Sequence, residues 1–264
     1  MKVRGERECR ECGRRWSYYE TGSVECPDCE SPRSVGVDDR TAHTDAPVSL
    51  DLSDHRARFG DADVTLPPEG VDELKADLRE YVRKRGFIRG GELLPLDATY
   101  LAARELLEAV DCYDRLRDPS DADREYLLDL LAGADDGVRP APERVPERLR
   151  EGRGMAAARA VGEYRSDLLA FLDELTDEVG GNSGFESPAV SVSGGDAGSR
   201  VEPARAVLDR LRDRVKRVEA LNGDVPVHDA DALVDAVDAV GEYVRTGEDA
   251  AIDRARARLS TRDA

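Results

Sequence analysis

Four cysteines near the start of the chain have the residue type and spacing of a metal site. Cys9 and Cys12 form one Cys-x-x-Cys pair, Cys26 and Cys29 form a second, and thirteen residues separate the pairs. Four thiolates at the corners of a tetrahedron bind a zinc ion with bonds of about 2.3 Å. The spacing therefore predicts one structural zinc ion, with no open position at which water is activated.

Three other interpretations of these cysteines stay open. Two disulfides fit the geometry but do not fit a reducing compartment. A rubredoxin-type iron site uses the same four ligands, and tetrahedral sulfur does not separate iron from zinc. A redox dithiol is typical of a single Cys-x-x-Cys beside a βαβ unit, which the sequence lacks. Zinc is the metal that the tetrathiolate spacing favours most.

The residues around the cysteines predict a small β module at 1–37. Trp16 and Tyr18 alternate with polar residues, as in a half-buried strand, and 34–37 predict a returning third strand. A module of this size falls below the ~40 residues at which a hydrophobic core suffices for folding. A structural zinc ion supplies on the order of 10 kcal/mol of folding free energy. We therefore expect the metal to hold this module together.

The module also resembles a known ribbon. The segments "CRECG" and "CPDCES", with "WSYYETGSVECPDC" leading into the second, resemble the zinc ribbon of transcription factor IIB type. With "RGFIRGGELLPLDATYLAA", the whole chain resembles a haloarchaeal family of uncharacterised zinc-ribbon proteins with a helical body. The resemblance implies that Cys9, Cys12, Cys26 and Cys29 are the ligands and that the ribbon docks on transcription machinery. In that transcription factor, two cyclin-like helical repeats bind promoter DNA. No such duplication is visible in this sequence, so the resemblance does not imply promoter binding.

Beyond the ribbon, the hydrophobic periodicity becomes helical. Asp97 is the expected N-cap of one helix, and another helix is expected to start at Ser120. The predicted domains are a zinc ribbon at 1–37, an irregular tether at 38–70, a helical bundle at 71–180, a Gly/Ser-rich linker at 181–200 and a helical hairpin domain at 201–264. The predicted fold class is mainly α, with a small N-terminal rubredoxin-like β ribbon.

The charge balance indicates an acidic, strongly hydrated surface. The formal charge is −18, and only four of the 39 basic residues are lysines. This composition is typical of salt-accumulating archaea, in which dense carboxylates keep proteins soluble. Residues 1–11 lack the apolar stretch of a signal peptide, and no run approaches the ~18 apolar residues of a membrane span. We therefore expect a cytoplasmic protein.

The ribbon is the least acidic part of the chain. Residues 1–36 contain seven basic and seven acidic side chains, so the remainder carries the whole −18. Arginines near the two cysteine pairs are candidate partner contacts, or else they shield the charge of the tetrathiolate: Arg10, Arg14, Arg15 and Arg33. Salt near molar strength shortens the Debye length to about 3 Å and weakens phosphate binding. A protein partner is therefore favoured, and nucleic acid stays open.

No catalytic or cofactor-binding residue is predicted. Cys112 lies at the edge of an apolar helical stripe and is expected to pack rather than react. His43, His55 and His228 lack partners at metal-ligand spacing, and the sequence has no phosphate loop, dinucleotide fingerprint or nucleophile elbow. The sequence favours a non-catalytic interaction module. The alternatives are an enzyme with its site in the helical body, and an oligomerising protein that uses 201–221.

Overall fold

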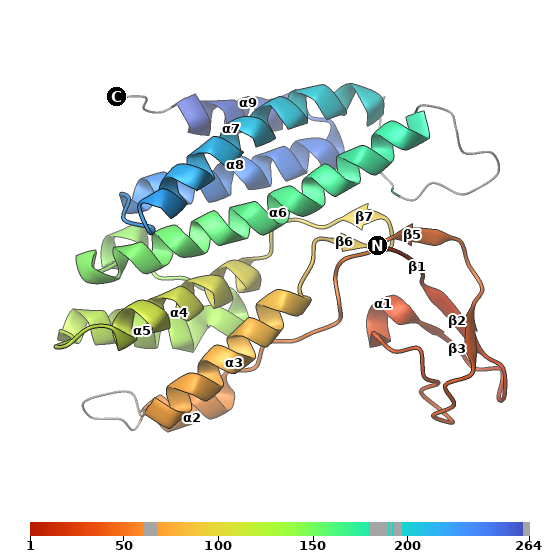
Figure 1. Ribbon diagram of the computed structural model, residues 1–264, viewed down its shortest axis with the longest axis horizontal. Helices are drawn as coiled ribbons and strands as arrows, with labels where there is room; N and C mark the ends of the chain where they lie inside the picture. Colours follow the sequence, from red (N-terminus) through yellow and green to blue (C-terminus); the bar gives the residue numbers. More distant parts are fainter. Residues whose placement is uncertain (61–67, 180–189, 191, 193–196, 261–264) are drawn as a thin grey trace.

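The protein is mainly α-helical in its described residues. The computed structural model describes residues 1–60, 68–179, 190, 192 and 197–260. Within them, strands occur only in the first 42 residues and in one short hairpin (Figure 1). This confirms the predicted fold class, a mainly α protein with a small N-terminal β ribbon. Among the described helices, none combines the length and the apolar run that crossing a bilayer requires.

The ribbon consists of two small antiparallel sheets. Its strands are β1 (Lys2–Arg4), β2 (Glu6–Cys9), β3 (Arg15–Ser17), β4 (Ser34–Gly36) and β5 (Arg40–Ala42). One sheet has the order β3-β2-β4, and β1 pairs with β5 in the other. The central strand β2 ends at Cys9, so the first cysteine pair begins where the sheet stops.

The predicted strand through Trp16 and Tyr18 is shorter than expected. It ends at Ser17, and α1 (Tyr18–Thr21) adds one helical turn, which Gly22 closes at φ 64°. The Tyr18 N–H donates to the Gly5 carbonyl at 2.7 Å, and the Gly22 N–H donates to the Tyr18 carbonyl at 2.8 Å. These bonds turn the chain away from the sheet, which a period-two pattern does not reveal.

The segment predicted as an irregular tether, 38–70, contains β5 and α2 (Ser53–Gly60). In α2, two residues four positions apart, His55 and Phe59, are buried and stack with ring centroids 6.3 Å apart. Leu52, directly before α2, is also buried, and the Arg56 N–H donates to its carbonyl at 2.8 Å. The other residues of α2 are charged, polar or small, so only these three positions carry the helical period. The sequence signal was too sparse to separate α2 from an irregular segment.

The body packs around one long helix. Its helices are α3 (Pro68–Lys84), α4 (Ala98–Asp114), α5 (Asp121–Gly133), α6 (Arg150–Val179), α7 (Val201–Ala220), α8 (Val227–Thr246) and α9 (Asp249–Ser260), and β6 (Ile88–Arg89) pairs with β7 (Glu92–Leu93). α6 has α3, α4 and α5 on one side and α7, α8 and α9 on the other (Figure 1). The predicted cap is confirmed, since the Asp97 side chain accepts from the Thr99 N–H. The helix expected to start at Ser120 does so, and Ser120 forms a capping box with Asp123.

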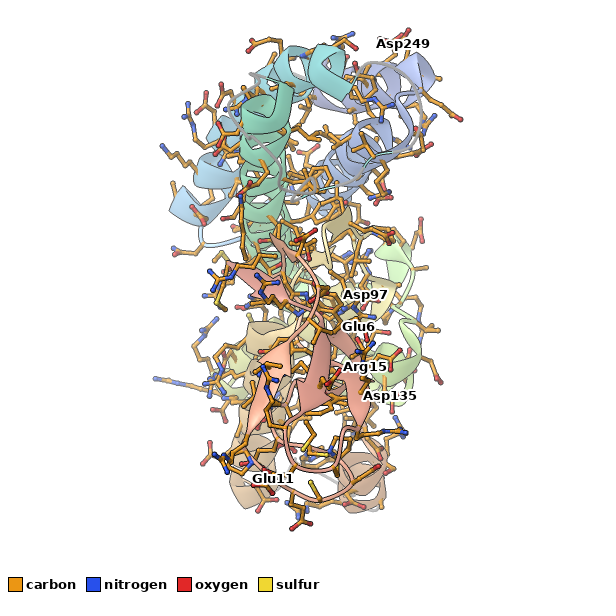
Figure 2. The ribbon with its side chains drawn as sticks, turned by 90° about the vertical axis from the view of Figure 1, so that its right-hand side faces the viewer. Glu6, Glu11, Arg15, Asp97, Asp135 and Asp249 are labelled. Atoms are coloured by element: carbon orange, nitrogen blue, oxygen red, sulfur yellow. The ribbon has the colours of Figure 1, made fainter. Side chains whose placement is uncertain are left out.

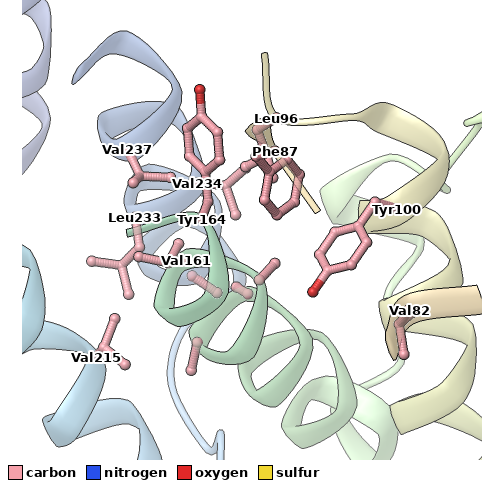
Figure 3. Close-up of a cluster of buried hydrophobic side chains, with 14 of the residues drawn as sticks. Val82, Phe87, Leu96, Tyr100, Val161, Tyr164, Val215, Leu233, Val234 and Val237 are labelled. Atoms are coloured by element: carbon pink, nitrogen blue, oxygen red, sulfur yellow. The ribbon is translucent and has the colours of Figure 1, made fainter. Parts of the chain in front are cut away.

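The C-terminal helices share the core of the bundle. Buried side chains from both sides of α6 form one continuous cluster, in which Tyr164 of α6 lies between Phe87 and Val237 (Figure 3). The segment 201–264, predicted as a helical hairpin with a short last helix near 249–260, forms α7, α8 and α9 in its described part. Most of the predicted linker, 181–200, lies outside the described residues, and 197–200 form a 3₁₀ turn before α7.

Candidate metal centre

The structure brings the sulfur atoms of the two cysteine pairs together. All four Sγ atoms lie within 4.8 Å of one another. Cys12 Sγ lies 3.5 Å from the Sγ atoms of both Cys26 and Cys29, and Cys9 Sγ lies 3.6 Å from that of Cys29. A tetrahedron of sulfurs around a metal at about 2.3 Å has edges of about 3.8 Å. The donor set and its spacing therefore fit one ion of the zinc type.

The two Cys-x-x-Cys turns have the same backbone hydrogen bonds. In the first, the Cys9 N–H donates to the Arg14 carbonyl at 2.8 Å, and the Gly13 N–H donates to the Cys9 carbonyl at 3.1 Å. In the second, the Cys26 N–H donates to the Ser31 carbonyl at 3.0 Å, and the Glu30 N–H donates to the Cys26 carbonyl at 2.9 Å. Each turn thus presents two sulfurs from a preorganised loop, which lowers the entropy lost on metal binding.

The two turns differ at the residue that follows the second cysteine. Gly13 has φ 77°, and its counterpart Glu30 has φ 56°. The left-handed region costs a non-glycine residue about 1–2 kcal/mol. The first turn therefore avoids a strain that the second turn carries.

Full ionisation of the four sulfurs is favoured by a cation between them. Backbone N–H groups of Cys12 and Glu11 lower the pKa of Cys9 to about 7. The Ser31 N–H lowers the pKa of Cys29, but the hydrogen bond with Cys12, burial and the other two thiols together raise it to about 12. One sulfur is thus poised to ionise, while four thiolates at this spacing repel one another without a positive charge between them.

Trp16 packs against the metal centre inside the ribbon. It forms a small buried cluster with Cys9 and Cys26 that is separate from the core of the body. Its indole N–H donates to the Ser23 carbonyl at 3.1 Å, which satisfies the polar edge of the ring. The chain has no other tryptophan, so its fluorescence reports on this cluster alone.

Three of the four candidate contact arginines are paired inside the ribbon. Arg15 lies 2.6 Å from Glu8, Arg33 lies 3.6 Å from Glu11 and Arg14 lies 3.7 Å from Asp28. Figure 2 shows Arg15 on the face of the sheet and Glu11 at the tip of the ribbon. The fourth candidate, Arg10, is exposed and makes no side-chain ion pair with a described residue. These three arginines thus pair with carboxylates of the ribbon, and their role as partner contacts stays a prediction.

A different set of cations lines a groove of about 410 Å³ on the ribbon, here called the basic groove. The lining residues are Lys2, Val3, Arg4, Arg7, Tyr18, Val24, Gly36 and Arg40. Four are cationic, and none carries a carboxylate. Sequence reasoning missed this groove because its residues come from four segments that only the sheet pairings bring together.

The remaining candidates have structural surroundings. Cys112 is buried, and burial raises the pKa of its thiol, so it packs as expected. His55 Nε2 lies 2.8 Å from Asp77, His228 lies 3.1 Å from Asp229, and His43 contacts the rings of Tyr18 and Tyr19. Within the described residues, the four cysteines form the only cluster of at least three side chains suited to hold a metal.

One family model matches residues 1–186 and 194–259, which include both the ribbon and the helical body. The chain belongs to the family of unknown function DUF7117. It matches no curated protein and no solved structure. Because the match runs through both regions, the family is defined by the ribbon together with its body.

The ribbon packs directly on the body. The Tyr19 ring lies against two glycines, one from each region: a Cβ atom on Gly5 would lie 2.2 Å from it, and one on Gly90 would lie 2.9 Å away. The His43 ring also packs against the Tyr19 ring, and the two ring centroids lie 4.6 Å apart. Lys2 also pairs with Glu174 of α6 at 2.6 Å. The basic groove therefore has a fixed position on the molecule.

Proposed function

We propose that this chain is a non-catalytic interaction module in which a zinc-stabilised ribbon binds an acidic segment of a partner protein. Four protein sulfurs close the coordination sphere of zinc, so the metal serves structure and leaves no site for chemistry. The observation that carries the proposal is the basic groove, because a chain with a formal charge of −18 leaves no carboxylate among its lining residues.

Lys2 of the groove pairs with Glu174 of α6, but its three arginines pair with no carboxylate of a described residue. Arg4 donates to the backbone carbonyl of Asp38, and Arg7 donates to the Ser34 hydroxyl at 2.9 Å, so both bind neutral acceptors. The Arg40 side chain makes no hydrogen bond or ion pair with a described residue, and Arg40 lies directly opposite Arg4 in the β1–β5 pair. Like charges in such cross-strand positions destabilise a sheet. A negative partner relieves this repulsion.

The groove also has an apolar component. Tyr18, Val3 and Val24 line it, and Val24 is 47% exposed. The acidic composition favours a cytoplasm with a high salt concentration. Apolar contacts keep their strength at such a concentration, whereas exposed ion pairs are screened. A partner segment that alternates acidic and apolar residues fits both features. The resemblance to the transcription factor IIB ribbon supports transcription machinery as the source of this segment.

The proposal is tested with a fluorescent peptide of alternating Glu and Leu, added to the full chain and followed by anisotropy. Saturable binding is expected, and the double variant Arg4→Gln/Arg40→Gln is expected to weaken it about tenfold, because two exposed ion pairs contribute up to about 1 kcal/mol each. Arg15→Gln is the matched control, since Arg15 lies in the ribbon but outside the groove. Equal weakening in the control, or no binding by the wild type, contradicts the proposal.

A single-stranded oligonucleotide of equal charge provides the competing arm. The specific argument for nucleic acid is Tyr18, which is half-buried and lines the groove, because bases stack on accessible aromatic rings in single-strand sites. Tighter binding of the oligonucleotide than of the peptide, lost in Tyr18→Ala, would replace the protein partner by nucleic acid.

A further inference from the structure

A second cationic hollow lies in the helical body, between α3, α4 and α6. Its volume is about 590 Å³, within the range of about 300–1,000 Å³ typical of small-molecule sites. Nine residues line it: Arg79, Val82, Arg83, Arg85, Arg104, Leu107, Asp111, Arg159 and Glu163. Five arginines face two carboxylates in this lining, which is a local excess of positive charge in a strongly acidic chain.

Arg104 is the most informative of these arginines. Its side chain is only 12% exposed, and its Nε donates to the Tyr100 hydroxyl at 3.1 Å. The guanidinium carbon lies 5.4 Å from the centroid of the same ring. Neither terminal nitrogen makes a hydrogen bond with a described residue, and the nearest carboxylate oxygen, on Glu163, is 4.0 Å away. Arg104 is therefore half-buried, and its one ion pair with a described residue, Glu163, is long, so its terminal nitrogens keep N–H donors for an anion.

Two neighbouring arginines are similarly uncommitted. Arg83 makes no hydrogen bond or ion pair with a described residue. The closest carboxylate oxygen to Arg79, on Asp111, lies 3.9 Å away. By contrast, Arg85 is held by Asp45 and Asp97, and Arg159 is held by Glu108. Arg85 and Arg159 are therefore held in place by ion pairs and form part of the wall of the hollow. Arg79, Arg83 and Arg104 keep N–H groups that can donate to a ligand.

We propose that this hollow binds the phosphate group of a phosphorylated small molecule. Guanidinium groups match the geometry of phosphate oxygens with paired N–H donors, and clustered arginines supply the charge that a dianion needs. The hollow is larger than a phosphate ion, and Val82 and Leu107 give it apolar walls. The ligand is therefore a phosphate ester whose organic part contacts these walls. This site is independent of the basic groove and of the metal centre.

The site is tested by calorimetric titration of the full chain with inorganic phosphate and, separately, with phenyl phosphate. The ionic strength is held constant with chloride. Both ligands are expected to bind saturably, and phenyl phosphate is expected to bind more tightly because its ring meets the apolar walls. Arg104→Gln should weaken both at least about tenfold, and Arg104→Lys should recover part of the loss, because a lysine keeps the charge but not the paired donors.

Two further variants guard against misfolding and non-specific charge effects. Arg83→Gln removes an exposed donor from the same hollow and should weaken binding several-fold with the helical signal unchanged. Arg212→Gln removes one charge from α7, on the far side of α6, and should leave binding unchanged. If Arg104→Gln does not fold, Arg83→Gln decides the test.

Three results overturn the proposal: no saturable binding of either ligand, unchanged binding in both Arg83→Gln and Arg104→Gln, or equal weakening in Arg212→Gln. Loss of phosphate binding in Arg4→Gln/Arg40→Gln, with Arg104→Gln unaffected, places the anion in the basic groove and also contradicts it. Failure of the peptide experiment on the ribbon has no bearing on these outcomes, so the two proposals stand or fall separately.

Discussion

The ribbon and the helical body are stabilised by different means. In the ribbon, the buried apolar cluster consists of Cys9, Trp16 and Cys26, two of which are candidate metal ligands. In the body, aromatic and aliphatic side chains from helices on both sides of α6 form one large core, and a buried ion-pair network adds to it. The body can therefore fold by packing, whereas the ribbon needs a cross-link. Each of the following predictions separates these two cases.

The largest effect is expected from loss of one sulfur ligand. Cys26→Ser removes a buried corner of the tetrahedron and should abolish metal binding, with loss of on the order of 10 kcal/mol from ribbon folding. Rapid proteolysis within residues 1–37, with a resistant helical fragment, is the expected result. Cys112→Ser is the matched control because Cys112 is buried in the body, and it should keep both the metal and the resistance. Stable metal binding by Cys26→Ser would contradict the prediction.

The next effect concerns the body alone. Arg153 joins buried Glu105 at 2.9 Å and Asp231 at 2.8 Å, so Arg153→Met removes one of the two arginines paired with Glu105 and the arginine paired with Asp231. Removing one partner of a buried ion pair costs about 3–5 kcal/mol. Urea unfolding followed by circular dichroism measures the loss, and metal content should not change. Arg256→Met, at an exposed pair on α9, is expected to change stability by less than about 0.5 kcal/mol.

The two cysteine turns differ in a way that predicts opposite effects. Gly13→Ala puts a side chain at φ 77°, where no heavy atom would clash with it, and should destabilise the ribbon by about 1–2 kcal/mol from backbone strain alone. Glu30→Gly relieves strain at φ 56°, and after the entropic cost of glycine it should stabilise the ribbon by less than about 1 kcal/mol. Denaturation followed by Trp16 fluorescence checks both signs. Changes of the same sign would show that φ does not control these positions.

The smallest effect concerns the contact between the two regions. Burial lowers the pKa of His43, with further lowering by Arg89 and the N-terminal amine against an opposing effect of Asp45. Because the pKa of His43 is lower in the folded state, the neutral imidazole contributes fully to stability at pH values above the unfolded-state pKa of about 6.5. This contribution is lost as the pH falls through the folded-state pKa. The wild type should therefore lose more stability than His43→Gln on acidification. Identical profiles of stability against pH for the wild type and His43→Gln would show that His43 does not contribute to the pH dependence.

Local sequence signals predicted much of this structure. The cysteine spacing lies within 21 residues, and the cap at Asp97 and the helix start at Ser120 depend only on neighbouring backbone, so each could be inferred without tertiary information. The helices that bury a full apolar stripe were also predictable from their period. Each of these features is determined by residues close together in the chain.

The features that sequence reasoning missed depend on contacts between distant residues. The basic groove combines Lys2 and Arg4 with Tyr18 and Arg40 through the β1–β5 pairing and the turn of α1. Arg104 gains its significance from the helices around it, since no sequence pattern shows that its closest carboxylate is 4.0 Å away. The paired state of Arg15 likewise follows from the register that sets it opposite Glu8.

The central claim is that one ion held by four sulfurs folds the ribbon while the body folds without it. A chelator titration of the purified full chain tests this most directly when metal release, Trp16 fluorescence and the helical dichroism signal are followed in the same sample. We expect one zinc ion per chain to leave together with a change in Trp16 emission, while the helical signal stays at its starting value. Protein purified without bound metal, or a helical signal that falls together with the Trp16 change, would contradict the claim.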